Sequence, residues 1–269
     1  YVLARRHLKQ SWSLIVALVF ATTPAVVYGA GSGQVEIRNA LFVVSAILAL
    51  TARGSEKATT YVLLAGLFAG FFVGGKYLGL LFAGACGLAV IWEKRRLNDG
   101  VIFSLGALLA GSQWYIWNAL HVGDPVFPAL FEWLGDPGTP FWSSEHQSYL
   151  RDVYIPGFQK IPSDLFWLFA FPFKATLFGE QVLSSGRTGL GPVILLLLPF
   201  AFGSAWLFRR SIQRGPLLTY ALILFCFYVV WFFSGTPQLV RFLLPVYPFL
   251  LVLFFSATAR LLTCYPLAE

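Results

Sequence analysis

Long runs of apolar residues recur along the whole chain and limit what it can fold into. The segments between these runs are short and carry most of the charged residues. A helix of about 17 to 25 residues is needed to cross roughly 30 Å of hydrocarbon, upright or tilted. We therefore predict an all-α membrane helix bundle of about eight transmembrane helices, forming a single domain over residues 1–269. The runs lie near residues 12–30, 38–52, 60–75, 77–92, 100–120, 188–208, 216–233 and 242–260.

The composition excludes a soluble domain. Hydrophobic residues make up 58% of the chain and charged residues only 12%, against roughly 25% charged residues in typical soluble domains. Too few polar side chains are present to cover a surface that faces water. The many Trp and Tyr residues are typical of the membrane interface, where one end of the side chain is apolar and the other is hydrated.

Residues 61–92 contain two of the runs without a polar segment between them. As one helix at 1.5 Å per residue they would be about 48 Å long, well over the hydrocarbon thickness. Gly74, Gly75 and Lys76 lie near the centre of this stretch. Glycine permits a chain reversal, and lysine is costly at the bilayer centre but tolerated at its surface. We predict two short helices with Lys76 at the turn between them.

The basic residues fall into two alternating sets of loops, which predicts the orientation of the chain. The richer set is expected in the cytoplasm, so the N-terminus is predicted to be cytoplasmic and residues 121–187 to form a long extracytoplasmic loop. If the short apolar segment 165–178 crossed the membrane, the richer set would be split, so we predict an interfacial or re-entrant helix there. The cytoplasmic set is Arg5, Arg6, Lys9, Arg53, Lys57, Lys94, Arg95, Arg96, Arg209, Arg210, Arg214 and Arg260. The other set is Arg38, Lys76, Arg151, Lys160, Lys174, Arg187 and Arg241.

Nucleic acid, metal and other cofactors are not indicated. The net charge of +7 comes from small basic clusters between apolar runs rather than from one basic face. The cysteines have no metal-ligand spacing and are expected to be packing residues. One loop contains metal-ligand residue types, but their spacing matches no known zinc or calcium pattern. The cysteines are Cys86, Cys226 and Cys264, and the loop residues are His121, Asp124, Glu145, His146 and Asp152.

Ionisable residues at helix ends are the natural candidates for function, because charge near hydrocarbon persists only where it is paired, hydrated or used. Glu36 could be an acid or base that faces a substrate, or a hydrated loop acid paired with Arg38. Lys76 could contact a lipid phosphate or extend to the membrane surface. Arg241, at the start of the last apolar run, could bind a phosphate or anchor to headgroups. The residues alone leave these alternatives open.

Several segments, in their order, resemble a family of membrane enzymes. They are a basic stretch at residues 1–6, residues 21–24, the acid Glu36, a glycine-rich stretch at 65–70 leading to Lys76 and Tyr77, Asn118 with residues 123–128, and residues 241–245. Together they resemble the polytopic GT-C glycosyltransferases that use polyprenyl-phosphate sugars. This is the protein O-mannosyltransferase-like group (glycosyltransferase family 39-like), which includes the lipid A aminoarabinose transferases. The similar segments cover most of the chain.

The resemblance implies transfer of a sugar from a polyprenyl-phosphate donor to a lipid, glycan or protein acceptor outside a bacterial inner membrane. It implies that Glu36 is the second acidic residue of the site. The family's first acid, which activates the acceptor, lies ahead of the part seen here. Because the chain also lacks an initiator Met, we expect an N-terminally truncated portion of a longer protein, or an inactive relative. The implied donor phosphate-binding residues are Lys76, Arg241 and Arg38, and the acceptor or loop candidates are Tyr77, Asn118 and Asp124.

Two other function classes remain open on the sequence. One is a non-enzymatic transporter or flippase of lipid-linked glycans, and the other is a polymerase or ligase of surface polysaccharide. A transporter is expected to place ionisable residues at mid-membrane depth. Here they cluster at the ends of the apolar runs, which favours chemistry at the membrane surface.

Overall fold

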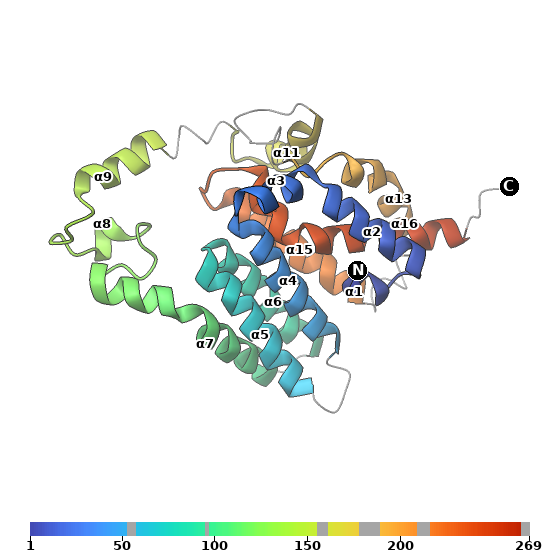
Figure 1. The fold of residues 1–269 in the computed structure, drawn as a ribbon, viewed down its shortest axis with the longest axis horizontal. Helices are drawn as coiled ribbons and strands as arrows, with labels where there is room; N and C mark the ends of the chain where they lie inside the picture. Colours follow the sequence, from blue (N-terminus) through green and yellow to red (C-terminus); the bar gives the residue numbers. More distant parts are fainter. Residues whose placement is uncertain (53–57, 95–96, 155–160, 178–188, 209–215, 265–269) are drawn as a thin grey trace.

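The computed structural model describes residues 1–52, 58–94, 97–154, 161–177, 189–208 and 216–264. Within these residues every regular element is a helix (Figure 1), which confirms the predicted all-α class. In the described part of the chain, four helical segments are long and apolar enough to cross a membrane: α4 (Val35–Ala52), α5 (Ala58–Gly75), α7 (Leu97–Val122) and the segment Val240–Thr263. The remaining runs form shorter or bent helices, so the count of eight spans stays a prediction.

The first apolar run is not one straight helix. After the short helix α1 (Val2–Arg5), the run divides into α2 (Gln10–Thr22) and α3 (Pro24–Ser32), which meet at an angle of 55°. Pro24 disfavours a helical conformation in the residue before it, and Thr23 is accordingly extended, with ψ of 131°. Counted together, α2 and α3 would be a fifth spanning segment.

Helices α4 to α7 form one half of the bundle, with α5 packed between α4 and α7. The backbones of α5 and α7 approach closely through small residues. A Cβ atom on Gly66 would lie 2.1 Å from the carbonyl oxygen of Phe103, and one on Gly106 would lie 2.5 Å from that of Leu63. Small residues at such contacts are typical of helix pairs in membranes, where association depends on close packing.

The second half consists of α13 (Val193–Leu207), α15 (Pro216–Phe233), the 3-10 segment η3 (Val240–Val246) and α16 (Tyr247–Cys264). Helix α15 packs against α6 (Leu78–Lys94), and η3 packs against α4, so these two contacts join the halves. Helix α11 (Leu165–Leu177) covers this half, with Phe171 in edge contact with Trp231 at 5.4 Å between ring centroids.

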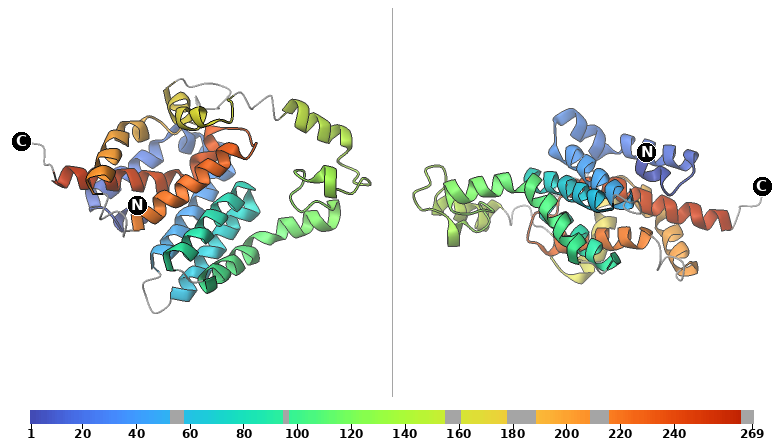
Figure 2. Two further views of the ribbon diagram at one scale, coloured as in Figure 1. Left: turned by 180° about the vertical axis from the view of Figure 1, so that it is seen from behind. Right: turned by 90° about the horizontal axis from the view of Figure 1, so that it is seen from below.

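Helix α7 extends away from the bundle and carries three short elements at its far end (Figures 1 and 2). These are α8 (Phe131–Leu134), α9 (Ser144–Tyr149) and the π-helical turn η1 (Leu150–Tyr154). They belong to the long loop predicted over residues 121–187, of which residues 155–160 and 178–187 lie outside the described part. The side of the membrane on which this loop lies stays a prediction.

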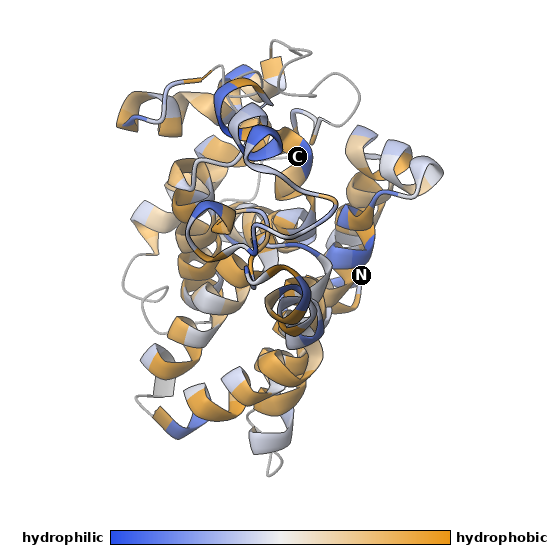
Figure 3. Ribbon diagram, turned by 90° about the vertical axis from the view of Figure 1, so that its left-hand side faces the viewer, coloured by the Kyte–Doolittle hydropathy of each residue, from blue (hydrophilic) through white to orange (hydrophobic). Residues whose placement is uncertain are grey.

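Large apolar side chains are exposed over most of the helices, and the ribbon is largely hydrophobic in Figure 3. Such a surface is compatible with a membrane-embedded protein. Cys86 is buried in α6 and Cys226 is half-buried in α15, consistent with packing roles. The side chain of Cys264 lies outside the described part of the chain. So do the following residues of the two basic sets: Arg53, Lys57, the Lys94 side chain, Arg95, Arg96, Lys160, Arg187, Arg209, Arg210 and Arg214.

Candidate functional site

An ion pair between Glu36 and Lys76 forms the centre of the site. Glu36 lies in the first turn of α4, where the helix dipole favours an acidic side chain. Lys76 follows the last residue of α5, and α6 begins two residues later, which confirms the predicted turn. The Lys76 Nζ and Glu36 Oε1 atoms are 2.6 Å apart, and the two side chains are 23% and 5% exposed. Glu36 is therefore a buried helix residue paired with Lys76, and the alternative of a hydrated loop acid paired with Arg38 is wrong.

Burial and charge act on Lys76 in opposite directions. Burial lowers its pKa, whereas the hydrogen bond and the charge of Glu36 raise it, and the nearby charge of Arg241 lowers it further. Removing one partner of a buried pair leaves the other charge uncompensated, which is costly. Glu36 thus stabilises the protonated form of Lys76 in a place that otherwise disfavours a cation.

The third group is contributed by η3, which packs against α4. The ring of Phe242 lies under Lys76, with 3.9 Å between Nζ and the ring centroid, and the Arg241 guanidinium is 5.6 Å from the same centroid. The Nε atom of Arg241 is buried and has no hydrogen-bond partner in the described part of the structure. Arg241 lies in the 3-10 segment ahead of α16, so its backbone is not yet part of the final α-helix.

Asn39, one turn after Glu36 on α4, belongs to the candidate site but was not among the residues predicted from the sequence. It is fully buried, and among the described residues neither atom of its amide has a hydrogen-bond partner. A Cβ atom on Gly75 would lie 3.1 Å from Asn39 Oδ1, so this amide lies beside the end of α5. Residues three apart on a helix share a face, and this spacing from Glu36 was the available signal. An unpaired buried amide is costly unless a ligand or water completes its bonds.

Arg38 lies apart from the ion pair. It is exposed, and within the described residues it makes no ion pair. A Cβ atom on Gly75 would lie 3.0 Å from Arg38 Nη2. Arg38 borders a separate groove with Gln113, Trp114 and other residues of α4, α5 and α7. The structure thus brings Lys76 and Arg241 together and places Arg38 on a neighbouring surface.

Tyr77, Asn118 and Asp124 form a second cluster that shapes the loop after α7. The Tyr77 hydroxyl donates to the carbonyl of Phe127, and Asn118 Nδ2 lies 3.4 Å from that hydroxyl. Asp124 is fully buried and accepts the backbone N–H groups of Val126 at 2.8 Å and Leu130 at 3.0 Å. With both carboxylate oxygens occupied in this way, Asp124 is suited to holding the turn.

The environment of Tyr77 fits this structural position. Burial raises the pKa of its hydroxyl, the charge of Asp124 adds to this rise, and the neighbouring Trp114 and Asn118 side chains oppose it. The phenol therefore stays protonated and can donate its hydrogen bond to the loop.

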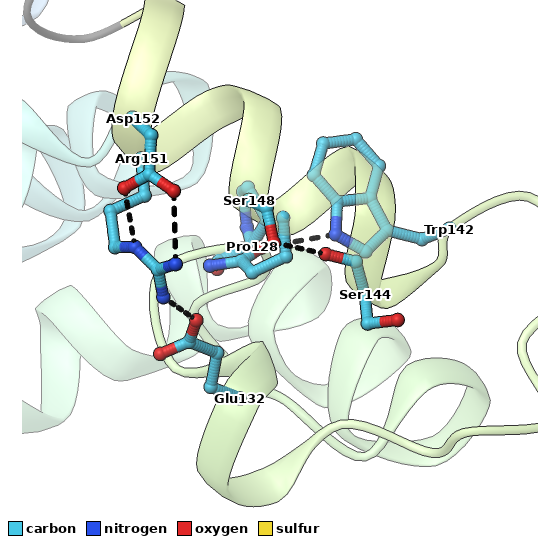
Figure 4. A network of polar contacts seen from close by, with 8 residues as sticks. Pro128, Glu132, Trp142, Ser144, Ser148, Arg151 and Asp152 are labelled. Carbon is cyan, nitrogen blue, oxygen red and sulfur yellow. Dashed lines mark hydrogen bonds and ion pairs between the residues drawn. The ribbon is translucent and has the colours of Figure 1, made fainter.

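The remaining loop residues form local contacts. Figure 4 shows Arg151 between Glu132 and Asp152, with its Nε atom 2.8 Å from Asp152 Oδ1. His121 stacks on Trp117, and Nδ1 of His146 lies 2.9 Å from the hydroxyl of Ser143. In the described part of the chain, no three His, Cys, Asp or Glu side chains gather in a way that could hold a metal ion.

Comparison with known proteins gave no match to a protein-family model, a curated protein or a solved structure.

Proposed function

We propose that the protein is a membrane glycosyltransferase that transfers a sugar from a polyprenyl-phosphate donor to an acceptor at the membrane surface. The observation that supports this most is the grouping of Glu36, Lys76 and Arg241 around Phe242, where η3 meets the break between α5 and α6. The order of sequence segments points to the same class. As predicted from the basic loops, the site would face the extracytoplasmic side of a bacterial inner membrane.

The charge of the site suits a phosphate. Lys76 and Arg241 are cationic and Glu36 is anionic, so the group carries one unmatched positive charge before a ligand binds. The unpaired Nε–H of Arg241 and the unpaired amide of Asn39 are further polar groups without partners in the described residues. Guanidinium groups bind phosphate well because their donors lie in one plane and remain charged.

An apolar cavity adjoins the same segment. It has a volume of about 460 Å³ and lies between α11, α13, α15, η3 and α16. The cavity is lined by Val240, Leu243 and Val246 of η3. In the same segment, Phe242 contacts Lys76, and Arg241 is close enough for its charge to act on that lysine. A ligand with a phosphate joined to a long hydrocarbon chain would occupy both sides of η3, which is why we favour a lipid-linked donor.

The proposed reaction needs no further activation of the donor. The acceptor's nucleophilic atom forms a bond to the anomeric carbon while the bond from that carbon to the phosphate oxygen breaks, and the electron pair leaves with the phosphate. Lys76 and Arg241 stabilise the charge that develops there. In this proposal the phosphate replaces Glu36 as the partner of Lys76, and the released carboxylate accepts the acceptor's proton.

Sugar transfer from labelled polyprenyl-phosphate donors, measured in membranes that contain the protein, tests this function. We expect Glu36→Gln, Lys76→Gln and Arg241→Gln each to reduce transfer by about 100-fold or more. Lys174→Gln and Arg151→Gln are charge-matched controls for the Lys76 and Arg241 variants, because these residues lie on α11 and η1, away from the ion pair. If the wild type transfers no sugar with a broad donor and acceptor panel but moves labelled lipid-linked glycan across liposomes, a transporter replaces this proposal.

A further inference from the structure

A second concave site lies on the α7 side of Gly75. It is a groove of about 480 Å³ formed by α4, α5 and α7. Small residues, including Gly74, Gly75 and Gly111, leave room in it, and Arg38, Gln113 and Trp117 supply larger polar and aromatic groups. Gly75, which lies next to Lys76, lines this groove. The lining does not include Glu36, Lys76 or Arg241.

Among the described residues, Arg38 is the charged side chain that lines this groove. In the parts of the chain that the structure describes, no carboxylate pairs with it. Beside it, the rings of Phe42 and Phe71 stack at 5.3 Å between centroids and form an apolar wall. The Coulomb attraction between a guanidinium and an anion is stronger beside apolar surface than in bulk water, because the local dielectric constant is lower.

The opposite wall is aromatic. Trp114 and Trp117 stack with centroids 5.3 Å apart and an interplanar angle of 5°, and His121 continues the stack one turn further. Both tryptophans are exposed and line the groove. Tryptophan prefers the level of lipid headgroups, where its ring meets apolar chains and its N–H meets polar groups.

We propose that this groove binds the headgroup of an anionic membrane phospholipid of the phosphatidylglycerol type. The phosphate contacts the Arg38 guanidinium, the headgroup hydroxyls reach the Gln113 amide, and the tryptophans contact the glycerol and the upper acyl chains. Charge selects an anionic lipid over a zwitterionic one, and the small residues of the floor admit the headgroup between α4 and α7. Lipid binding in this groove does not depend on the proposed sugar transfer, because the groove uses none of Glu36, Lys76 and Arg241.

The test is native mass spectrometry of the full chain, released from detergent that contains phosphatidylglycerol or phosphatidylcholine. We expect wild-type protein to retain one phosphatidylglycerol selectively, and Arg38→Gln to weaken this retention about tenfold, as expected from losing one charge-assisted contact. Arg6→Gln is the matched control. It removes the same charge from an exposed arginine between α1 and α2, outside the groove, and should retain the lipid as the wild type does.

A second pair of variants tests the aromatic wall without changing charge. Trp117→Leu should weaken retention about threefold, within the range of a single aromatic contact. Trp133→Leu, which alters an exposed tryptophan of α8 away from the groove, should leave it unchanged. Equal loss in Arg38→Gln and Arg6→Gln, or loss in neither, overturns the proposal. Full displacement of the lipid by soluble glycerol phosphate also overturns it, since the ligand is then a free phosphoester.

Discussion

The ammonium of Lys76 and the carboxylate of Glu36 lie 2.6 Å apart, although 40 residues separate them in the chain. The pair joins the start of α4 to the end of α5, and Phe242 of η3 closes it from a third element. The start of α4, the end of α5 and η3 therefore meet at one buried ion pair.

Breaking this pair from one side should destabilise the protein. Lys76→Met leaves the Glu36 carboxylate buried without its partner, and we expect a loss of about 3 kcal/mol or more in the free energy of unfolding. The double variant Glu36→Gln/Lys76→Met removes both charges and should recover a large part of this loss. Titration with SDS in mixed micelles measures these differences. A double variant that is as unstable as the sum of the single variants would contradict a direct interaction.

Binding of a phosphodiester should depend on pH through Lys76. Burial lowers the pKa of this lysine, so it loses its proton, and with it the attraction for an anion, at a lower pH than an ordinary lysine. Affinity for a nonhydrolysable polyprenyl phosphodiester, whose own charge is constant, should therefore fall as pH rises through this lowered pKa. In Glu36→Gln a group that raises the pKa is lost, so the midpoint should move to lower pH. Identical midpoints in the two proteins would argue against Lys76 as the titrating group.

Close packing of α5 against α7 should make Gly66 intolerant of a side chain. A Cβ atom there would lie 2.1 Å from the carbonyl oxygen of Phe103, so the helices must move apart, and we expect Gly66→Ala to cost about 1–3 kcal/mol. Gly84→Ala in α6 is the control, because in the described part of the chain no atom beyond its chain neighbours and its own helix backbone lies within 4 Å of the added methyl group. That variant should be neutral or slightly stabilising, since alanine favours helix. Thermal unfolding in detergent distinguishes the two.

Asp124 should stabilise the loop after α7 more than it stabilises the rest of the protein. Asp124→Ala removes the acceptor of two backbone N–H groups at a buried position, and we expect a cost of about 1–3 kcal/mol. Hydrogen exchange of residues 123–135 should increase in this variant. Asp136→Ala provides the comparison, because among the described residues the Asp136 carboxylate accepts one hydrogen bond, from the exposed N–H of Gly138. Unchanged exchange in Asp124→Ala would show that the turn is held by other contacts.

Helix boundaries were predictable from the sequence where a physical limit applied. The stretch 61–92 was too long for one membrane crossing, and the chain does break beside Lys76. The bend at Pro24 was missed, although the residue before a proline disfavours helix. The count of eight spans stays a prediction, because several apolar helices are shorter than a full crossing.

The candidate site was only partly predictable from the sequence. Glu36, Lys76 and Arg241 were identified as candidates, but their mutual contacts depend on how distant segments pack. Arg38 was grouped with them, and here the helix geometry was the missing information. Residues two apart on a helix do not face each other, so once Glu36 lies within α4, Arg38 turns to another surface. Asn39, three residues from Glu36, shares its face instead.

Lys76 and Tyr77 are joined by a single peptide bond, yet they belong to different neighbourhoods. Lys76 contacts Glu36 and Phe242, whereas Tyr77 holds the loop after α7 through the carbonyl of Phe127. Because their backbones are continuous, a displacement of the loop that moves the Tyr77 backbone would also move the backbone of Lys76, which carries the ammonium of the ion pair.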